Sequence, residues 1–358
     1  MDHVTVYGRP GRYGGWPANS GIWKFGTKEL VVGFNEGKLD TSLSGMHPMD
    51  MGTQVWTQAR STDGGLTWGM LEHAIRTPDV SSEESCPGTI DFSATKFAMR
   101  FLRSSDGNLA ASWFFLTDDK AKTWNGPYRL PDLGERGPDG EGGTVARTDY
   151  QVLGPAELLA FVAAVKPDGM AAHAMCVHTD DGGQTWTRRG WIGPEPDGRS
   201  YMPSTVRIAD GRIIAALRRR EGDEVFIDLY ESTDSGFEWE HVGTPVESLG
   251  GSNGNPPALL LLKGGERMVL TYAWRGENPA IRARISDDFG RTWSEERELR
   301  GSSTGPTPAN PDLGYTRNAL RSDGRIVTCY YYNEPPDDGR DPGDGERSIQ
   351  ATIWHPDK

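Results

Sequence analysis

Residues 61–68 read STDGGLTW, and four further segments of the chain repeat this pattern. Its elements are Ser or Thr, then Asp, Gly, Thr and Trp, with one residue between each of the first four. The Trp residues that end successive copies are 53 to 62 residues apart. This period is too long for helical repeats and is typical of a four-stranded β-propeller blade. The copies are 61–68, 117–124 (with Ala121 at the Gly place), 179–186, 232–239 (with Glu238 at the Thr place) and 286–293.

Each part of the motif has a local structural role that elementary stereochemistry explains. The Asp carboxylate is expected to accept hydrogen bonds from the N–H groups of its own turn. The Gly is expected to adopt a positive φ, and the Trp to fill the gap between neighbouring sheets. We therefore interpret these Asp residues as structural, rather than as catalytic or calcium-binding.

A second repeated feature is a pair of apolar segments separated by a tight turn, which occurs six times and is typical of β-hairpins. Together the repeats predict one all-β domain over residues 1–358, a six-bladed β-propeller of four-stranded antiparallel blades. The sixth blade has no copy of the motif. We expect its strand at 347–354 to pair with the N-terminal strand at 3–8, closing the ring and removing exposed sheet edges.

Composition and charge exclude several other classes of protein. The 46 Gly and 24 Pro residues favour a fold with many turns over a helical bundle. A net charge of −13 repels phosphate, so neither nucleic acid nor an anionic membrane is an expected partner. The three cysteines are far apart and no two histidines have metal-ligand spacing, so we predict no metal and no cofactor.

The beginning of the chain lacks the basic and apolar regions of a secretory signal. We therefore expect a cytoplasmic protein, unless a leader was trimmed before Met1. The sequence makes no prediction of oligomeric state.

Polar and aromatic residues occur at the beginning of the inner strand of each expected blade and at the end of the strand that follows it. These positions converge at one end of a propeller, and buried polar groups concentrate at functional sites. For each residue the alternative is that it only pairs with its neighbours across a narrow polar tunnel. The expected rim contains Trp16, Asp91, Asp149, Tyr150, Arg218, Asn255, Arg275, Tyr315, Arg317 and Tyr331, with His47 and Asp50 from the loop at 35–53.

Five such motifs at blade spacing resemble the sialidase superfamily, whose motif is called the Asp box or BNR repeat. The resemblance covers nearly the whole chain. It implies an Arg triad for a substrate carboxylate, a Tyr nucleophile assisted by Glu, and an Asp acid/base. Tyr315 matches the nucleophile and Arg218 the second Arg, while Asp50 lies on the loop that carries the acid/base.

The chain departs from the sialidase pattern at three positions. Gly15 stands where the first Arg of the triad belongs, and Pro203 stands where the Glu belongs. The third Arg is unassigned, with Arg275 as the candidate. These departures argue against sialidase activity itself, while leaving a related activity open.

The first hypothesis for function is therefore an exo-acting glycoside hydrolase on a terminal, anionic sugar of an oligosaccharide or glycoconjugate. Arginine suits a carboxylate because its planar fork binds both oxygens. Tyr315 would be the nucleophile, and a pair of carboxylates would supply acid and base. The carboxylate candidates are Asp50, Asp91 and Asp149, and the substrate-binding candidates are Arg218, Arg275, Arg317 and Asn255.

Two alternatives remain open. One is a lyase that cleaves by β-elimination beside a uronic acid, with His47 or Tyr315 as the base and a Tyr as the acid. The other is a non-catalytic glycan-binding propeller, with Trp16, Tyr150 and Tyr331 as stacking platforms.

Overall fold

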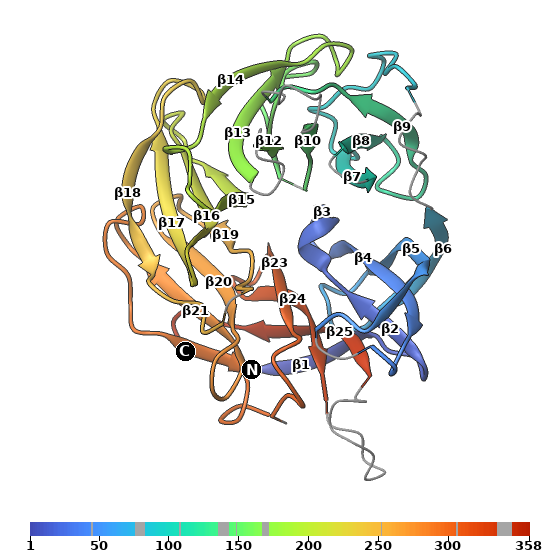
Figure 1. The fold of residues 1–358 in the computed structure, drawn as a ribbon, viewed down its shortest axis with the longest axis vertical. Helices are drawn as coiled ribbons and strands as arrows, with labels where there is room; N and C mark the ends of the chain where they lie inside the picture. The colour runs from blue at the N-terminus through green and yellow to red at the C-terminus, as the bar shows by residue number, and fades with distance from the viewer. Residues whose placement is uncertain are drawn as a thin grey trace. The chain divides into compact units, whose positions relative to one another are not determined.

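The computed structural model describes residues 1–43, 46–75, 83–106, 109–134, 143–147, 149–166, 172–251, 253–305, 307–334 and 346–358. Strands dominate these ranges, and a single turn of 3-10 helix, η1 (Pro17–Asn19), is their one helical element. The chain divides into two compact units (Figure 1). Unit 1 contains Met1–Arg76 and Ser248–Lys358, and unit 2 contains Thr77–Glu247. Each unit is described by itself.

Unit 1 contains a nine-stranded sheet and a four-stranded sheet. The larger sheet runs in the order β23-β24-β25-β2-β4-β5-β6, with β1 paired to β25 and β3 paired to β4. Its strands are β1 (Asp2–Tyr7), β2 (Arg12–Gly15), β3 (Gly21–Phe25), β4 (Glu29–Leu39), β5 (Met49–Ser61), β6 (Gly69–Ile75), β23 (Gly314–Leu320), β24 (Ile326–Asn333) and β25 (Arg347–Trp354). The smaller sheet contains β19 (Ala258–Leu261), β20 (Met268–Trp274), β21 (Ala280–Ser286) and β22 (Arg297–Arg300).

Unit 2 contains sheets of three, five and four strands. The first contains β7 (Ala98–Asp106), β8 (Leu109–Thr117) and β9 (Asn125–Leu130). The second contains β10 (Gly143–Val145), β11 (Tyr150–Val152), β12 (Leu158–Val165), β13 (Ala172–Thr179) and β14 (Thr187–Trp191). The third contains β15 (Arg199–Arg207), β16 (Ile213–Glu221), β17 (Glu224–Ser232) and β18 (Glu240–Val246).

The repeated motif forms the turn that its sequence predicts. In the first copy, the Asp63 carboxylate accepts hydrogen bonds from Leu66 N and Thr67 N, each at 3.0 Å, and from Thr67 Oγ1 at 2.6 Å. Gly65 has a φ of +92° and Trp68 Nε1 donates to its carbonyl at 3.0 Å. Asp119, Asp181, Asp234 and Asp288 accept equivalent hydrogen bonds within their own turns. The structural interpretation of these carboxylates is confirmed.

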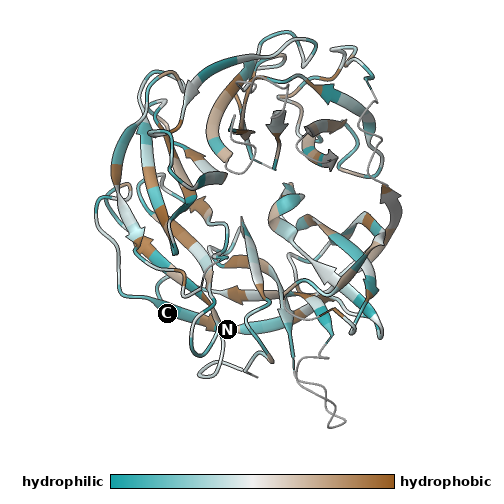
Figure 2. Ribbon diagram, in the orientation of Figure 1, coloured by the Kyte–Doolittle hydropathy of each residue, from teal (hydrophilic) through white to brown (hydrophobic). Residues whose placement is uncertain are grey.

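The motif tryptophans also join neighbouring sheets. Trp186 packs edge-on against Phe114 of β8, with ring centroids 5.4 Å apart, and Trp239 packs against Phe161 of β12 at 6.2 Å. Apolar residues concentrate in the strands and hydrophilic residues in the connecting loops (Figure 2). The core therefore lies between stacked sheets, and the strand ends are left for polar residues.

The all-β propeller class is confirmed, but the prediction of six separate four-stranded blades is wrong: the described strands form five sheets, of nine, five, four, four and three strands. In unit 1, β2 pairs antiparallel with β4 and parallel with β25, so the expected first and sixth blades merge. In unit 2, the expected inner strand at 88–93 is a turn in which Ser93 N donates to Asp91 Oδ1 at 2.8 Å. The hairpin of β7 and β8 directly precedes its motif, which leaves that sheet with three strands.

The predicted pairing of the chain ends occurs. Strand β1 runs antiparallel to β25 from the pair Asp2 and Ile353 to the pair Tyr7 and Ile349. Hydrogen bonds between described residues do not, however, close a complete propeller ring. No helix in the described ranges is long and apolar enough to cross a membrane.

Candidate functional site

A histidine and a buried carboxylate form the centre of a polar cluster in unit 1. The Nδ1 atom of His47 lies 2.9 Å from Asp312 Oδ1, and His47 N donates to Asp312 Oδ2 at 3.1 Å. Asp312 is fully buried, whereas the His47 side chain is 31% exposed. Trp16 Nε1 donates to the same Nδ1 atom at 3.2 Å and the Tyr13 hydroxyl lies 3.2 Å from it, so three polar groups hold the His47 ring through Nδ1. None of these contacts involves Nε2.

Four aromatic residues surround this pair. Trp16 packs edge-on against His47 with ring centroids 5.1 Å apart, and Tyr13 contacts both Trp16 and the Asp312 carboxylate. The Tyr331 hydroxyl donates to Asp312 Oδ1 at 2.8 Å. We call the six residues Tyr13, Trp16, His47, Asp312, Tyr315 and Tyr331 the His47 cluster.

The charge of Asp312 is held in place by the residues around it. Burial alone would raise its pKa, but the hydrogen bond from His47 and the charges of His47, Arg347 and Arg275 hold it well below the usual range. Arg347, itself buried, donates through Nε to Asp312 Oδ2 at 3.0 Å. Asp312 therefore stays ionised at any ordinary pH and orients the His47 ring.

Arg275 is anchored by the backbone. Its guanidinium donates to Leu313 O at 2.8 Å, to Gly254 O at 3.0 Å and to the Tyr331 hydroxyl at 2.6 Å. Most of its donors are therefore used inside unit 1. The predicted role of Arg275 as a carboxylate-binding arginine is not supported by this geometry, which instead makes it a support for Tyr331.

Tyr315 enters the cluster at the start of β23. Its ring lies edge-on to those of His47 and Tyr331, at centroid distances of 6.4 and 5.9 Å. Its N–H donates to Asn255 Oδ1 at 2.9 Å. Its hydroxyl makes no hydrogen bond with any residue in the described part of the chain, and the residue as a whole is 9% exposed. Asn255 is completely buried and acts through Tyr315, rather than as a substrate-binding residue.

Backbone strain concentrates in the same place. Nine non-glycine residues in the described ranges have a positive φ, and five of them lie in motif turns or in the β20–β21 turn. Strained backbone of this kind gathers at functional sites. The remaining four residues with a positive φ are Trp16 (+57°), His47 (+68°) and Tyr315 (+54°) of the His47 cluster, and Met202 (+56°) of unit 2.

A buried amide lies beside the cluster. Asn35 of β4 stands opposite Gly15, the residue before Trp16, and is fully buried. Neither of its amide atoms has a hydrogen-bond partner among the described residues. A buried polar group without a partner is costly and requires an explanation, and a ligand at this site would provide one.

Unit 2 contains a second group of charges at the start of β15. Tyr201 lies opposite Arg218 in the β15–β16 register, and the Arg218 guanidinium is 4.8 Å from the Tyr201 ring centroid. Burial would raise the pKa of Tyr201, but the charges of Arg218, Arg199 and Arg147 outweigh it and lower that pKa. We call these three arginines the arginine cluster.

Arg218 itself is buried, with an exposed fraction of 6%. Its contacts are the Tyr201 ring and, at 4.0 Å, the sulfur of Met202, and it forms no ion pair within the described ranges. A buried positive charge without a carboxylate is costly. The arrangement is suited to an anion, which agrees with the predicted substrate-binding role of Arg218.

Several predicted site residues have other roles in the structure. Asp91 accepts from Ser93 in its own turn, and Asp50 accepts from Gly52 N at 3.0 Å. Asp149 accepts from Thr205 N and so joins two inner strands of unit 2. No pair of acid/base carboxylates is assembled from these three in the described contacts.

The remaining predicted residues also serve the fold. The Tyr150 hydroxyl accepts from Met99 N at 3.2 Å, and Arg317 donates to Ala18 O at 2.9 Å, which fixes η1. Trp16 and Tyr331 do lie in the cluster, but with exposed fractions of 7% and 0% they offer no open stacking face.

The sequence analysis missed two residues of the His47 cluster, Tyr13 and Asp312, and Arg347, which binds Asp312. Tyr13 stands two residues before Gly15, Asp312 begins the segment that contains Tyr315, and Arg347 begins the last strand. Each lies at the end of an expected strand, which is the signal that identified the other candidates. The described residues contain no group of three or more His, Cys, Asp or Glu side chains that could hold a metal ion.

Comparisons with known proteins support the fold class. No protein-family model matches this chain, and no curated protein matches it. Among solved structures, a protein of unknown function from Dyadobacter fermentans has a TM-score of 0.71 at 19% identity, over 99% of this chain and 97% of that one.

Two similar structures are glycoside hydrolases. An α-L-arabinanase of Penicillium chrysogenum, complexed with arabinobiose, has a TM-score of 0.63 at 12% identity, over 99% of this chain and 98% of that one. The Hadza microbial sialidase Hz136 has a TM-score of 0.59 at 13% identity, over 96% of this chain and 66% of that one. These likenesses show an all-β propeller fold.

Proposed function

We propose that this protein is a carbohydrate-active enzyme that breaks a glycosidic bond, with His47 and Tyr315 as its proton-transfer residues. The observation that carries the proposal is the His47–Asp312 contact of 2.9 Å beside Tyr315, whose hydroxyl has no hydrogen-bond partner among the described residues. An imidazole oriented by a buried carboxylate is a common general base, and a tyrosine is a common acid.

Of the chemistries that the sequence raised, β-elimination beside a uronic acid fits this machinery best. His47 Nε2 would take the proton from C5 of the sugar, and the electron pair would form the C4–C5 double bond as the C4–O bond breaks. Tyr315 would give its proton to the departing oxygen. Both proton transfers are then assigned to residues that contact one another, and no carboxylate pair is required.

An acidic sugar is supported independently by unit 2. The arginine cluster offers positive charge to an anion, and Arg218 has no acidic partner in the described part of the chain. The planar fork of an arginine binds both oxygens of a carboxylate, so an acidic sugar is a ligand that this cluster fits.

Hydrolysis of a terminal, anionic sugar by an exo-acting glycosidase is the second candidate. The free Tyr315 hydroxyl favours it, since His47 would activate that oxygen as a nucleophile in place of the missing Glu. The general acid of such a mechanism has no assigned residue, because Asp50, Asp91 and Asp149 are engaged elsewhere.

The experiment that tests the proposal is incubation of the protein with uronic-acid-containing oligosaccharides and polysaccharides. Elimination yields an unsaturated product with new absorbance near 235 nm, and Tyr315→Phe should abolish it. Release of a reducing sugar without that absorbance would instead favour hydrolysis. Glycan binding without turnover of any substrate would overturn both enzyme proposals and leave the binding-protein alternative.

A further inference from the structure

Two consecutive arginines of β16 in unit 2 lie on opposite faces of their sheet and differ in their partners. Arg219 lies 3.4 Å from the Asp228 carboxylate and also pairs with Glu221. Arg218 is as deeply buried, with an exposed fraction of 6%, but forms no ion pair within the described ranges. Its guanidinium lies 4.8 Å from the ring centroid of Tyr201 instead. On this face of the sheet, the positive charge therefore meets a phenol where the other face supplies carboxylates.

The strand register places a second arginine beside the same phenol. Tyr201 stands opposite Arg218 in the β15–β16 pair, and Arg199 precedes Tyr201 by two residues on β15. Residues two apart on a strand share a face, and so do cross-strand partners, so these three side chains lie together. Arg199 likewise forms no ion pair among the described residues. The next residue after Tyr201, Met202, has a φ of +56°, a strained conformation of the kind that gathers at functional sites.

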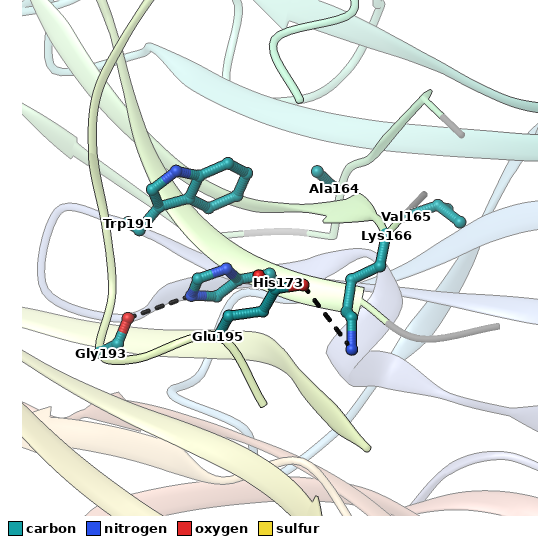
Figure 3. Close-up of a pocket in the computed structure, with 7 residues that line it drawn as sticks. All are labelled: Ala164, Val165, Lys166, His173, Trp191, Gly193 and Glu195. Atoms are coloured by element: carbon teal, nitrogen blue, oxygen red, sulfur yellow. Dashed lines mark hydrogen bonds and ion pairs between the residues drawn. The ribbon is translucent and has the colours of Figure 1, made fainter. Parts of the chain in front are cut away.

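The other titratable groups on the strands packed against β15 have contacts of their own. Strand β12 contains none of them. His173 Nε2 of β13 lies 3.0 Å from the carbonyl oxygen of Gly193 (Figure 3). The remaining groups are Asp149, which accepts from Thr205 N; Tyr150, which accepts from Met99 N; His178, which pairs with Glu157; Cys176, a buried thiol; Arg219 and Glu221, which pair with each other; and Arg220, which pairs with Asp223.

The phenol of Tyr201 is both accessible and unusually placed to carry a negative charge. The residue is partly exposed, so solvent and a ligand can reach it. Burial would raise its pKa, but the charges of Arg218, Arg199 and Arg147 outweigh burial and lower that pKa. In the same unit, by contrast, burial raises the pKa of Tyr128. The arginines that would hold an anionic ligand are therefore the ones that stabilise the Tyr201 phenolate, and the two negative charges compete for them.

We propose that the phenolate of Tyr201 is the resident counter-ion of the arginine cluster, and that it takes up one proton when the carboxylate of an acidic sugar replaces it. The phenolate oxygen accepts a proton from the solvent, the ligand's carboxylate pairs with the arginines, and the new phenol O–H donates to that carboxylate. The net charge of the site is then the same before and after binding. This inference rests on the anion-binding role of the arginine cluster in the proposed function, and it adds a control of that site by pH.

The test is calorimetric titration of the protein with glucuronate at about pH 9, in two buffers that differ in ionisation enthalpy, so that the protons taken up are counted. The unmodified protein should take up protons, and its affinity should fall by up to ~10-fold for each pH unit above the pKa of free Tyr201. Tyr201→Phe should bind glucuronate without proton uptake and with an affinity that no longer falls with pH. Tyr128→Phe, a change on β9 of the same unit, should behave like the unmodified protein.

The ultraviolet absorbance of tyrosinate gives a second measurement. In an alkaline titration without ligand, Tyr201→Phe should lack the first ionisation step, and glucuronate should move that step to higher pH in the unmodified protein.

Binding of glucuronate without proton uptake, or with the same uptake in Tyr201→Phe, would overturn the role of Tyr201 and leave the anion site standing. Absence of glucuronate binding would overturn the anion site and the role of Tyr201 together. Turnover in the absorbance assay depends on His47 and Tyr315, so failure of the proposed enzyme activity is a separate result.

Discussion

The His47 cluster of unit 1 and the arginine cluster of unit 2 handle buried charge in opposite ways. Asp312 is surrounded by donors, and every neighbouring cation or hydroxyl stabilises its charge. Arg218 is also buried, yet its contacts are an aromatic ring and a sulfur. Because the hydrogen bonds of Asp312 are made within the protein, they hold the surrounding side chains in one geometry. The charge of Arg218 has no acidic partner among the described residues, so it can bind an anion. On the proposed function, proton transfer belongs to the first cluster, and the buried charge of the second is suited to an anion.

The largest effect on turnover is expected from a change at His47, the partly exposed residue of the His47 cluster. His47→Gln should lower turnover by ~10²- to 10⁴-fold, because general acid–base catalysis contributes about that much. The measurement is the initial rate on the substrate found in the absorbance assay. His355→Gln is the matched control, since its side chain is also 31% exposed and faces Asp357. Equal losses in both variants would remove His47 from the mechanism.

Removal of the buried carboxylate tests whether the network stabilises the fold. Asp312→Asn should lower the free energy of unfolding by ~3–5 kcal/mol, because it leaves buried arginines without their counter-charge. The folded-state pKa of Asp312 is depressed, so its stabilisation is complete above the unfolded value of 3.8 and is lost only in acid. Urea denaturation at neutral pH measures the loss. A change below ~1 kcal/mol would show that the network is not structural.

In the arginine cluster, by contrast, we expect a substitution to weaken ligand binding and to leave stability almost unchanged. Arg218→Met should change the free energy of unfolding by less than ~1 kcal/mol, since no ion pair is broken. It should weaken the binding of glucuronate to unit 2 ~10-fold, measured by calorimetry, because a charge-assisted hydrogen bond is lost. Arg207→Met, at an exposed arginine of the neighbouring strand β15, is the control for non-specific charge effects. Marked destabilisation with an unchanged affinity for glucuronate would contradict the assignment.

The smallest expected effect is in the motif turns, which both units share. Hydrogen bonds from Thr67, Ser61 and Leu66 outweigh burial and lower the pKa of Asp63 to about 2. The ionised carboxylate therefore contributes stability above pH ~4, and this contribution is lost as the pH falls towards 2. In Asp63→Asn the melting temperature should depend less on pH over that interval. Turnover at neutral pH should be unchanged. An identical acid profile in both proteins would show that the Asp63 charge is not linked to folding.

The fold could be predicted because its signals are local. The motif turns close within eight residues, so their Asp, Gly and Trp residues act on their immediate neighbours wherever the motif occurs. The blade count could not be predicted in the same way. The merger of two blades depends on the register of Tyr13 against Arg347, which lie at opposite ends of the chain.

The candidate site could be predicted only in part. Tyr315, Trp16 and Tyr331 were identified because polar and aromatic residues at strand ends are unusual, and His47 because it lies on a long loop; the structure brings them together. Asp91 and Asp149 at strand ends and Asp50 on the same loop met these criteria, but their carboxylates are engaged by nearby backbone N–H groups. Position at a strand end does not reveal which hydrogen bonds a side chain already makes.

The sequence by itself therefore determined the all-β class, the turns and the strand ends where polar residues gather, because each rests on contacts between residues close in the chain. Only the tertiary structure decided which of those residues act together. His47 and Asp312 are 265 residues apart in the chain, yet their side chains are 2.9 Å apart in space. That contact, which orients the imidazole, forms only when the strands of unit 1 have assembled.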